Sequence, residues 1–309
     1  MARARSTAAR TAAAPHTETL TTMLDTGLAG RSVWITGASG GIGRALARSF
    51  AAQGAQLVLS AHSQLAALEE FAARELAGHE ILCTTCDVRD AAACERTAHL
   101  GAQRFGRLDH VVANAGRWPS EPKRLDVLDP ARLLDTVAVN LLGAAHTLRA
   151  FVRELARSGP RAANDPHTGG ASAVVIGSTA GRFGERNHSD YAMAKAGLVG
   201  LVLSLKNEIV SLDPAARVNL IEPGWTATEM ARPALQNDSA VTRVVRTMAL
   251  RQLGRADDVA QAALWLCSPR LSPHATGQTL TLAGGMEGRL LWGEDEVDAE
   301  QARARTRRS

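Results

Sequence analysis

The sequence predicts an α/β fold: a single doubly wound domain with a seven-stranded parallel sheet and helices on both faces. Short apolar runs of strand length alternate along the chain with segments of helical periodicity. The first run, Val33–Ile35, is fully apolar, as a buried parallel strand should be. It leads through Thr36 into a glycine-rich turn. Strict alternation of this kind implies parallel strands joined by right-handed crossovers.

The remaining elements follow in order. Ile42, Leu46 and Phe50 recur at helical spacing after the first strand, and Gly54 marks the end of that helix. Further strands are expected at Gln56–Ser60, Glu80–Cys86, His110–Ala113, Ala173–Ile176, Val218–Ile221 and Gln278–Leu282. Helices are expected after the capping residues Ser63, Asp90 and Ser189, over a long stretch from about Ala131 to Ala156, and near Asp258–Leu266.

Composition limits the class of protein. Hydrophobic residues make up 45% of the 309 and charged residues 21%, which is the ordinary range of a globular protein and excludes collagen-like and disulfide-scaffold chains. No apolar run approaches the roughly 18 residues of a membrane span, so no membrane partner is expected. Three of the four cysteines fall within Cys83–Cys94, which indicates a reducing compartment rather than a disulfide framework. The expected location is therefore cytoplasmic.

The charge pattern predicts two tails around one domain. The net charge of +4 and the pI near 9.2 arise mainly from arginines near the two ends. Residues 1–29 are expected to be a disordered extension, although their acid-poor composition is also that of a mitochondrial transit peptide. Residues 288–309 are expected to be a charged, solvated tail, and 30–287 the domain. No nucleic-acid-binding motif accompanies the basic charge, so no nucleic-acid partner is expected.

The turn after the first strand carries a phosphate-binding pattern. Glycines at 37, 41 and 43 permit a tight turn and let a pyrophosphate approach the backbone. The following helix presents its free N–H groups and its positive dipole end to the phosphates. A glycine triplet alone is weak evidence, but this one lies between a strand and a helix, as dinucleotide binding requires.

A second group of residues suits acid–base chemistry. Tyr191 and Lys195 are four residues apart, so one helical face presents both to the same site. A phenol with a pKa near ~10 is a poor acid–base group at neutral pH, and a neighbouring ammonium is expected to lower that pKa. Ser178 follows the fifth strand at the sheet edge where ligands bind. Tyr191 is also the only tyrosine in the chain.

These motifs, with their Gly-x3-Gly-x-Gly spacing, resemble the short-chain dehydrogenase/reductase family of Rossmann-fold, Tyr-x3-Lys enzymes. The resemblance covers about Arg31 to Met286 and departs from the family at Ala283, where the family has an acidic residue. It implies that Tyr191 exchanges the proton, that Lys195 lowers its pKa and holds the nicotinamide ribose, that Ser178 orients the substrate, and that Asn140 supports a proton relay. It also implies cofactor contacts from Gly37, Ser39, Gly40, Gly41, Ile42, Gly43, His62, Asp87, Val88, Asn114, Ala115, Gly116, Tyr191, Lys195, Pro223, Gly224, Thr226 and Thr228.

The end of the second strand bears on the choice between NADP and NAD. An acid there would bind the ribose 2′-hydroxyl and repel a 2′-phosphate, but the stretch Ser60–Ser63 has none. This absence favours NADP(H), with NAD(H) still possible. His62 could hydrogen-bond the phosphate, although a neutral imidazole is a weak substitute for the arginine that such enzymes usually offer.

The sequence offers further candidates for metal ligands and substrate contacts. Cys83, Cys86 and Cys94 suggest metal ligands, but buried, inert thiols are the better interpretation, so no metal site is expected. His188 could contact substrate. Arg117, Trp118 and Pro119 fall near the expected site mouth, and Trp225 and Met230 fall in the expected substrate lid; the two tryptophans could line an apolar pocket or simply pack.

The leading hypothesis is an oxidoreductase that transfers hydride between NADP(H) and a carbonyl/secondary alcohol pair. A 3-oxoacyl thioester or a small apolar ketone is a plausible substrate by family frequency. The alternatives are an NAD-dependent alcohol dehydrogenase, a family member that epimerises or dehydrates its substrate, and a non-catalytic dinucleotide-binding regulator. The resemblance further implies a homo-oligomer, a dimer or tetramer, formed through the long helix and the Tyr/Lys helix.

Overall fold

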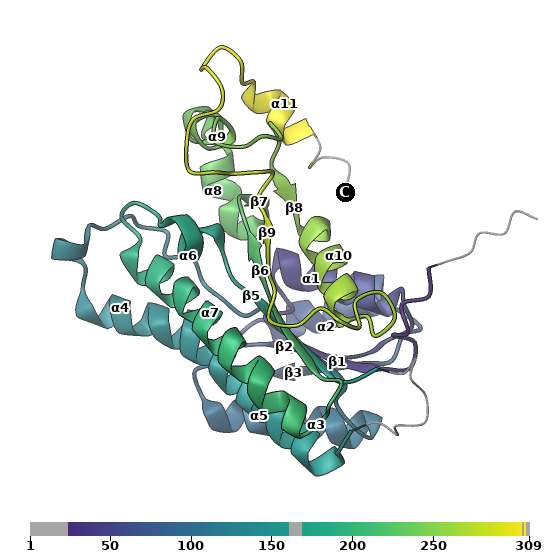
Figure 1. The fold of residues 1–309 in the computed structure, drawn as a ribbon. Helices are drawn as coiled ribbons and strands as arrows, with labels where there is room; N and C mark the ends of the chain where they lie inside the picture. Colours follow the sequence, from purple (N-terminus) through teal and green to yellow (C-terminus); the bar gives the residue numbers. More distant parts are fainter. Residues whose placement is uncertain (1–23, 161–168, 305, 307–309) are drawn as a thin grey trace, which may run out of the picture.

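The computed structural model describes residues 24–160, 169–304 and 306. Their main feature is a sheet of seven parallel strands in the order β3-β2-β1-β4-β5-β6-β9 (Figure 1). The strand order reverses between β1 and β4, as in a doubly wound fold. The predicted fold class is confirmed. The strands are β1 Ser32–Thr36, β2 Gln56–Ala61, β3 Ile81–Thr85, β4 His110–Ala113, β5 Ser172–Ile176, β6 Arg217–Pro223 and β9 Thr279–Leu282.

Helices cover both faces of the sheet, with a separate apolar core under each layer. One layer contains α1 (Gly41–Ala51), α2 (Leu65–Glu75) and α10 (Ala256–Cys267), and the other contains α3 (Ala91–Phe105), α5 (Gly143–Ser158) and α7 (Ser189–Glu208). All five β1 residues are buried, because successive side chains enter opposite cores. Asp90 caps α3 by accepting from the Ala92 N–H at 2.8 Å, as predicted.

Three local expectations were wrong. The long helix predicted over 131–156 is α4 (Pro130–Val137), a π-helical segment η2 (Ala138–Leu142) and then α5. Ser63 does not cap α2, which begins at Leu65 after Gln64 and has no side-chain cap. Ser189 is the first residue of α7 and not its cap, since His188 occupies that position. Propensity and capping patterns do not register the tertiary contacts that set these boundaries.

A smaller layer lies beyond the carboxyl ends of β6 and β9. It comprises α8 (Arg232–Leu235), α9 (Asp238–Val245), α11 (Ala299–Ala304) and a two-stranded ribbon of β7 (Thr226–Ala227) and β8 (Gly254–Arg255). Figure 1 shows α11 beside α9 at the top of the molecule. Short elements η1 (Leu125–Val127), α6 (Thr179–Phe183), η3 (Ile209–Ser211) and η4 (Glu229–Ala231) complete the chain.

The two ends bear on the predicted tails. Residues 1–23 lie outside the described residues, and in the adjoining segment Leu28 is already fully buried. At the other end the structure differs from the solvated tail that the charge pattern predicts. Ala302 is fully buried against α9, and the Trp292 indole N–H donates to the Met248 carbonyl oxygen at 2.6 Å. Apolar residues within this charged segment supply the contact, and their signal is masked by the surrounding acids and arginines.

Between the long helix and the fifth strand the sequence also predicts a loop over 158–170, and this segment lies mostly outside the described residues. Among the helices within 24–160 and 169–304, none has the length and apolarity needed to cross a membrane.

Candidate active site

Every predicted site segment lies at one edge of the sheet. Gly37 follows β1, His62 follows β2, Asp87 follows β3, Asn114 follows β4 and Ser178 follows β5. Parallel strands bring their carboxyl ends to the same edge, and the reversal between β1 and β4 opens a crevice there. The fold therefore assembles the candidate residues in one region, although their partners differ from residue to residue.

The glycine loop is tightly constrained by its own backbone. Gly37 has φ +63°, a left-handed conformation that favours glycine. A Cβ on Gly43 would lie 2.3 Å from the Gly37 carbonyl oxygen, and a Cβ on Gly41 would lie 3.0 Å from the Thr228 methyl carbon. No side chain caps α1 at Gly40, so the first N–H groups of this helix remain available to phosphate oxygens.

The segment after β4 is fastened to this loop. The Asn114 side-chain amide donates to the carbonyl oxygens of Thr36 at 2.9 Å and Gly37 at 3.1 Å. The Ala115 N–H donates to the Thr36 hydroxyl oxygen at 3.0 Å. Asn114 and Ala115 thus hold the two turns in register, and Gly116 is positioned between them and the catalytic candidates.

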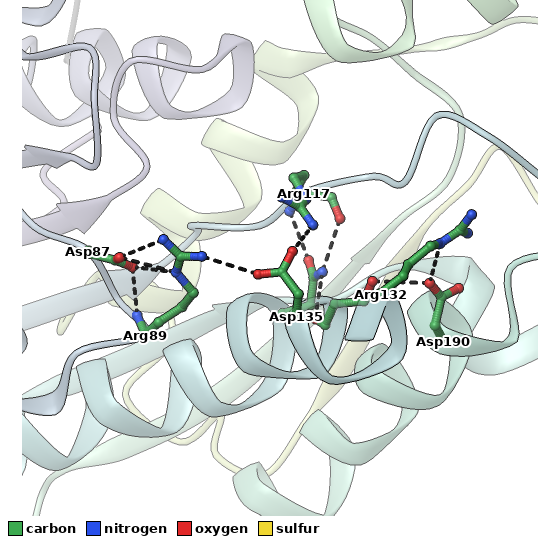
Figure 2. Close-up of polar contacts among 8 residues, drawn as sticks. Asp87, Arg89, Arg117, Arg132, Asp135 and Asp190 are labelled. Atoms are coloured by element: carbon green, nitrogen blue, oxygen red, sulfur yellow. Dashed lines mark hydrogen bonds and ion pairs between the residues drawn. The ribbon is translucent and has the colours of Figure 1, made fainter. Parts of the chain in front are cut away.

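A line of alternating charges runs from Asp87 to Arg117 (Figure 2). The Arg89 guanidinium donates hydrogen bonds to both oxygens of the Asp87 carboxylate and also donates to Asp135 at 3.1 Å. Asp135 in turn pairs with Arg117. Hydrogen bonding from Arg89 holds the pKa of Asp87 below its usual range. His62 Nε2 approaches the same carboxylate at 3.4 Å, so four charged groups and one imidazole share this edge.

Lys195 lies deep in the site. Its ammonium donates to the Ile176 carbonyl oxygen at 2.9 Å and lies 5.8 Å from the centre of the Tyr191 ring. Burial lowers the pKa of Lys195 to about 8, because the charged form loses its hydration. A Cβ on Gly116 would lie 3.4 Å from this nitrogen, at ordinary van der Waals distance, so the segment after β4 lies directly beside the ammonium.

Tyr191 differs from the expectation of an activated phenol. Burial raises the pKa of Tyr191 to about 12, and only hydrogen bonding with the Ser178 hydroxyl opposes that rise. The expected lowering by Lys195 is not found, since the ammonium donates to the Ile176 carbonyl and burial is the largest influence on the pKa of the phenol. Ser178 caps α6 by accepting from the Ala180 N–H at 3.1 Å, which fixes its side chain at the end of β5.

Asn140 occupies the π-helical segment η2 and is almost fully buried. Its side-chain oxygen accepts from the Arg117 N–H at 2.9 Å, and its amide donates to the Arg117 carbonyl at 3.0 Å and the Thr136 carbonyl at 3.0 Å. A Cβ on Gly116 would lie 3.0 Å from the same side-chain oxygen. Asn140 and Lys195 therefore meet at Gly116, and Asn140 also fixes the backbone that follows it.

An aromatic cluster stands against the phenol. The Trp118 indole stacks on the His188 ring at 4.1 Å between centroids, and meets the Tyr191 ring edge-on at 4.9 Å. His188 is buried, and its Nε2 hydrogen-bonds the Pro119 carbonyl oxygen at 3.0 Å. The sequence left open whether Trp118 packs or lines a pocket. No spacing rule links positions 118 and 188, because their contact arises only from the tertiary fold.

The segment after β6 completes the crevice. The Gly224 N–H donates to the Leu282 carbonyl at 2.9 Å, and a Cβ on Gly224 would lie 2.9 Å from the Ala283 methyl carbon. Thr226 donates its hydroxyl to the Gly224 carbonyl at 3.0 Å. The alanine that departs from the family pattern thus packs closely on the Pro223–Gly224 turn.

The lid candidates separate into a half-buried residue, Trp225, and an exposed one, Met230. Trp225 packs on the apolar cluster formed with Val241, Val245 and Met248, whereas Met230 is 55% exposed. Trp225 is thus a packing residue in this structure. Met230 remains accessible for contact with a ligand.

The cysteines do not form a metal centre in the part of the chain that the structure describes, where no cluster of three His, Cys, Asp or Glu side chains is suited to hold an ion. Cys83 lies on β3 but is only half-buried, and Cys86 follows the strand instead of belonging to it. Cys86 and Cys94 are both buried, with their sulfur atoms 3.8 Å apart.

Comparison with known proteins identifies the family. A family model described as enoyl-(acyl carrier protein) reductase matches residues 37–287, which include all the turns described above. The fold and the matched length define a dinucleotide-linked oxidoreductase of the α/β class. The chain belongs to the short-chain dehydrogenase/reductase family.

Individual relatives vary in what their names say they act on. The chain is 32% identical to 3-oxoacyl-[acyl-carrier-protein] reductase of Escherichia coli over 257 residues, covering 83% of this chain and 97% of that protein. It is 31% identical to L-rhamnose 1-dehydrogenase (NAD(P)(+)) of Azotobacter vinelandii, covering 83% and 96%. A solved 7α-hydroxysteroid dehydrogenase with NADH and 7-oxo glycochenodeoxycholic acid superposes with a TM-score of 0.76 at 27% identity, covering 86% and 98%.

Proposed function

We propose that this protein is an NADP(H)-linked oxidoreductase that interconverts a ketone and a secondary alcohol, with Tyr191 as its acid–base group. The observation that carries the proposal is that Lys195 lies 5.8 Å from the Tyr191 ring, whose hydroxyl hydrogen-bonds Ser178, while Asn140 and Lys195 both approach Gly116 at the edge of the sheet. The glycine loop fits a dinucleotide, because Gly37 and Gly43 have no room for a Cβ and no side chain caps the N-terminus of the helix that follows.

The mechanism follows from where the side chains lie. The hydroxyls of Ser178 and Tyr191 hydrogen-bond the substrate carbonyl oxygen, and the phenol delivers its proton to that oxygen. When bound, the nicotinamide cofactor supplies the hydride. Lys195 holds positive charge near the phenol, which stabilises the phenolate that proton transfer leaves behind. Asn140 fixes the backbone after Gly116 through Arg117 and so keeps this wall of the site in place.

The proton inventory favours reduction. With its pKa raised to about 12, the Tyr191 phenol keeps its proton at neutral pH and is ready to donate it. Lys195, with a pKa lowered to about 8, still carries its proton at neutral pH. A protonated phenol suits a carbonyl substrate better than an alcohol, which needs a base.

NADP is supported by the charges around the end of β2. The residues after Ala61 are His62 and Ser63, so no carboxylate stands where the ribose 2′-oxygen is expected. Arg44 is held at the glycine loop by donation to the Ser39 carbonyl at 2.9 Å, which places a permanent cation near the position where Gly40 lacks one. The carboxylate of Asp87 near His62 is already neutralised by Arg89.

The deciding experiment is a fluorescence titration of the purified chain with NADPH and NADH side by side. We expect NADPH to bind at least tenfold more tightly, and His62→Asp to reduce or reverse that preference, because an added carboxylate repels the 2′-phosphate. Ser63→Ala serves as the control that adds no charge. Tighter binding of NADH would overturn the NADP assignment and favour alcohol oxidation, and binding of neither would overturn the enzyme assignment.

We further infer the substrate class, the assembly and the location of the protein. The relatives named above make a 3-oxoacyl thioester or another ketone the first substrates to screen. Apolar side chains are exposed along α4, η2 and α7, which supports a homodimer or homotetramer through these helices: Leu134, Leu142, Met193 and Leu203. Sedimentation analysis tests that assembly. Four free cysteines support a reducing, cytoplasmic location, which imaging of a tagged chain tests.

A further inference from the structure

A buried ion pair precedes the catalytic candidate Tyr191, and the mechanism above does not use it. Asp190 is fully buried at the start of α7, and Arg132 of α4 donates from Nε to its carboxylate at 3.0 Å (Figure 2). The Thr136 hydroxyl donates to the same carboxylate oxygen at 3.0 Å. The pair therefore joins α4 to the residue adjacent to the phenol.

The carboxylate is ionised despite its burial. Burial alone would raise the pKa of Asp190, but hydrogen bonds from Arg132, the Tyr191 backbone and Thr136 together bring it below its usual value. The N-terminal end of α7 adds a favourable dipole for a negative charge. A buried pair of this kind contributes little net stability, because the desolvation cost offsets the attraction, but it fixes a geometry.

The same guanidinium also reaches the segment that carries Trp118. We call residues 117–123, between β4 and η1, the wall loop. Arg132 Nη1 donates to the Glu121 carbonyl oxygen at 2.6 Å, so one planar group binds the wall loop and α7 at once.

Two further contacts join the wall loop to the chain just before Tyr191. His188 hydrogen-bonds the Pro119 carbonyl at 3.0 Å, and the Lys123 N–H donates to the Asn187 carbonyl at 2.8 Å. Between these attachments the Trp118 indole meets the Tyr191 ring at 4.9 Å. The wall loop is thereby held against the phenol, where the Trp118 ring covers part of it, and burial raises the pKa of Tyr191.

We propose that Arg132 and Asp190 are positioning residues that fix the wall loop at a set spacing from Tyr191, so that Trp118 closes one side of the substrate pocket and limits the size of the group beside the carbonyl. The proposal rests on the proposed function only for the word substrate, because the spacing itself is a property of the chain alone. Loosening the pair admits water to the phenol and widens the pocket.

The first test uses Tyr191 as its own reporter, since it is the only tyrosine. The near-ultraviolet tyrosinate band of the cofactor-free chain is followed after rapid jumps in pH, before alkaline unfolding intervenes. We expect a midpoint near the raised pKa of about 12 in the parent chain, and a midpoint lower by about one pH unit in Arg132→Ala, as water replaces the wall. The sign is diagnostic, because removing a cation beside a phenol would by itself raise its pKa.

Matched variants complete the experiment. Arg149→Ala breaks the ion pair between Arg149 of α5 and Glu95 of α3, and it should leave the midpoint unchanged. Arg132→Lys keeps the charge but loses the fork that reaches both Glu121 and Asp190, so it should give an intermediate midpoint. Arg132→Lys also carries the test if Arg132→Ala does not fold. A parental midpoint in the folded variant would overturn the proposal.

A second measurement, amide hydrogen exchange, needs no alkaline pH. Amide hydrogen exchange should become about tenfold faster in the wall loop of Arg132→Ala while the α5 amides keep their parental rates. An exchange rate in the wall loop equal to that of the parent chain would contradict the proposal.

A kinetic experiment uses NADPH with one small and one bulky ketone. The ratio of kcat/KM for the bulky ketone to that for the small one should rise about tenfold in Arg132→Ala. Absence of any turnover by the parent chain would refute the proposed function and leave the two readings above valid.

Discussion

The two sides of the crevice are built by different means. On the cofactor side, the contacts are made by backbone atoms, and a Cβ on Gly37 or Gly43 would lie 2.8 Å or less from the neighbouring backbone. On the substrate side, the contacts are made by long side chains from remote segments, as between Trp118 and His188. Gly37 and Gly43 therefore have no room for an added methyl group, whereas the contacts of the second side depend on which side chains meet there.

Replacement of Tyr191 by Phe should have the largest effect. The ring and its contact with Trp118 remain, but the proton donor is lost, so kcat for ketone reduction should fall about 10³-fold. NADPH affinity, measured by fluorescence titration, should stay within about twofold, because the hydroxyl is on the substrate side. A kcat within tenfold of the parent value would show that another group supplies the proton.

The pH dependence of stability should distinguish the buried lysine from the buried phenol. The pKa of Lys195 is lowered from 10.5 to about 8 by folding, so the unfolded chain binds more protons between these values and stability rises with pH across that window. The contribution is up to about 3 kcal/mol. The pKa of Tyr191 is raised to about 12, so stability falls as pH rises from about 10.

Denaturant unfolding of the cofactor-free chain at a series of pH values measures both slopes. Lys195→Met should remove the rise above pH 8, and Tyr191→Phe should remove the fall above about pH 10. A parental profile in Lys195→Met would mean that this amine is solvated in the folded chain.

Gly43→Ala should weaken cofactor binding by about 100-fold. Its new methyl group would lie 2.3 Å from the Gly37 carbonyl oxygen, so the loop must shift at a cost of roughly 1–3 kcal/mol. The matched control is Gly200→Ala on α7, where a Cβ meets nothing within 4 Å; it should raise stability by about 0.5–1 kcal/mol and leave binding unchanged. NADPH titration and thermal unfolding measure the pair.

Arg303→Ala should have the smallest effect. The Arg303 side chain donates to the Leu235 carbonyl at 2.9 Å and pairs with the exposed carboxylate of Asp238, so its loss should lower the free energy of unfolding by about 1 kcal/mol. Amide exchange should quicken in α8 and α9 only. Arg289→Ala, which breaks a pair at an exposed surface, is the control expected to change neither quantity. An equal effect of the two variants would mean that the C-terminal segment does not stabilise the lid.

The contrast between the two sides also explains what the sequence could predict. Gly37, Gly41 and Gly43 are needed by local geometry, so their spacing between a strand and a helix is readable without a structure. The strand ends that carry Asn114 and Ser178 follow from alternation alone. By contrast, the contact between Trp118 and His188 needs the three-dimensional path of the loop, and no residue spacing encodes it.

The pKa of the phenol could not be predicted from the sequence. The spacing of Tyr191 and Lys195 correctly predicted a shared face, but the balance between burial and charge decided the pKa of the phenol in the opposite direction to the one expected. The C-terminal contact of Ala302 was hidden because a lone small residue among charges gives no periodic signal. The ion pair between Arg132 and Asp190 could not be predicted either, because partners 58 positions apart form no local pattern in the sequence.

The π-helical segment at Ala138–Leu142 has a consequence for insertions and deletions. Each residue of an α-helix turns the chain by about 100°, so one residue added or removed would rotate everything beyond it. A π-helical turn absorbs one extra residue within itself. The azimuth of α5, set by Phe151 in the core, is thus decoupled from that of α4, set by Arg132 and Thr136. Deleting one residue here would therefore convert the turn to a regular α-helical one and leave both the α4 face and the core of α5 in place.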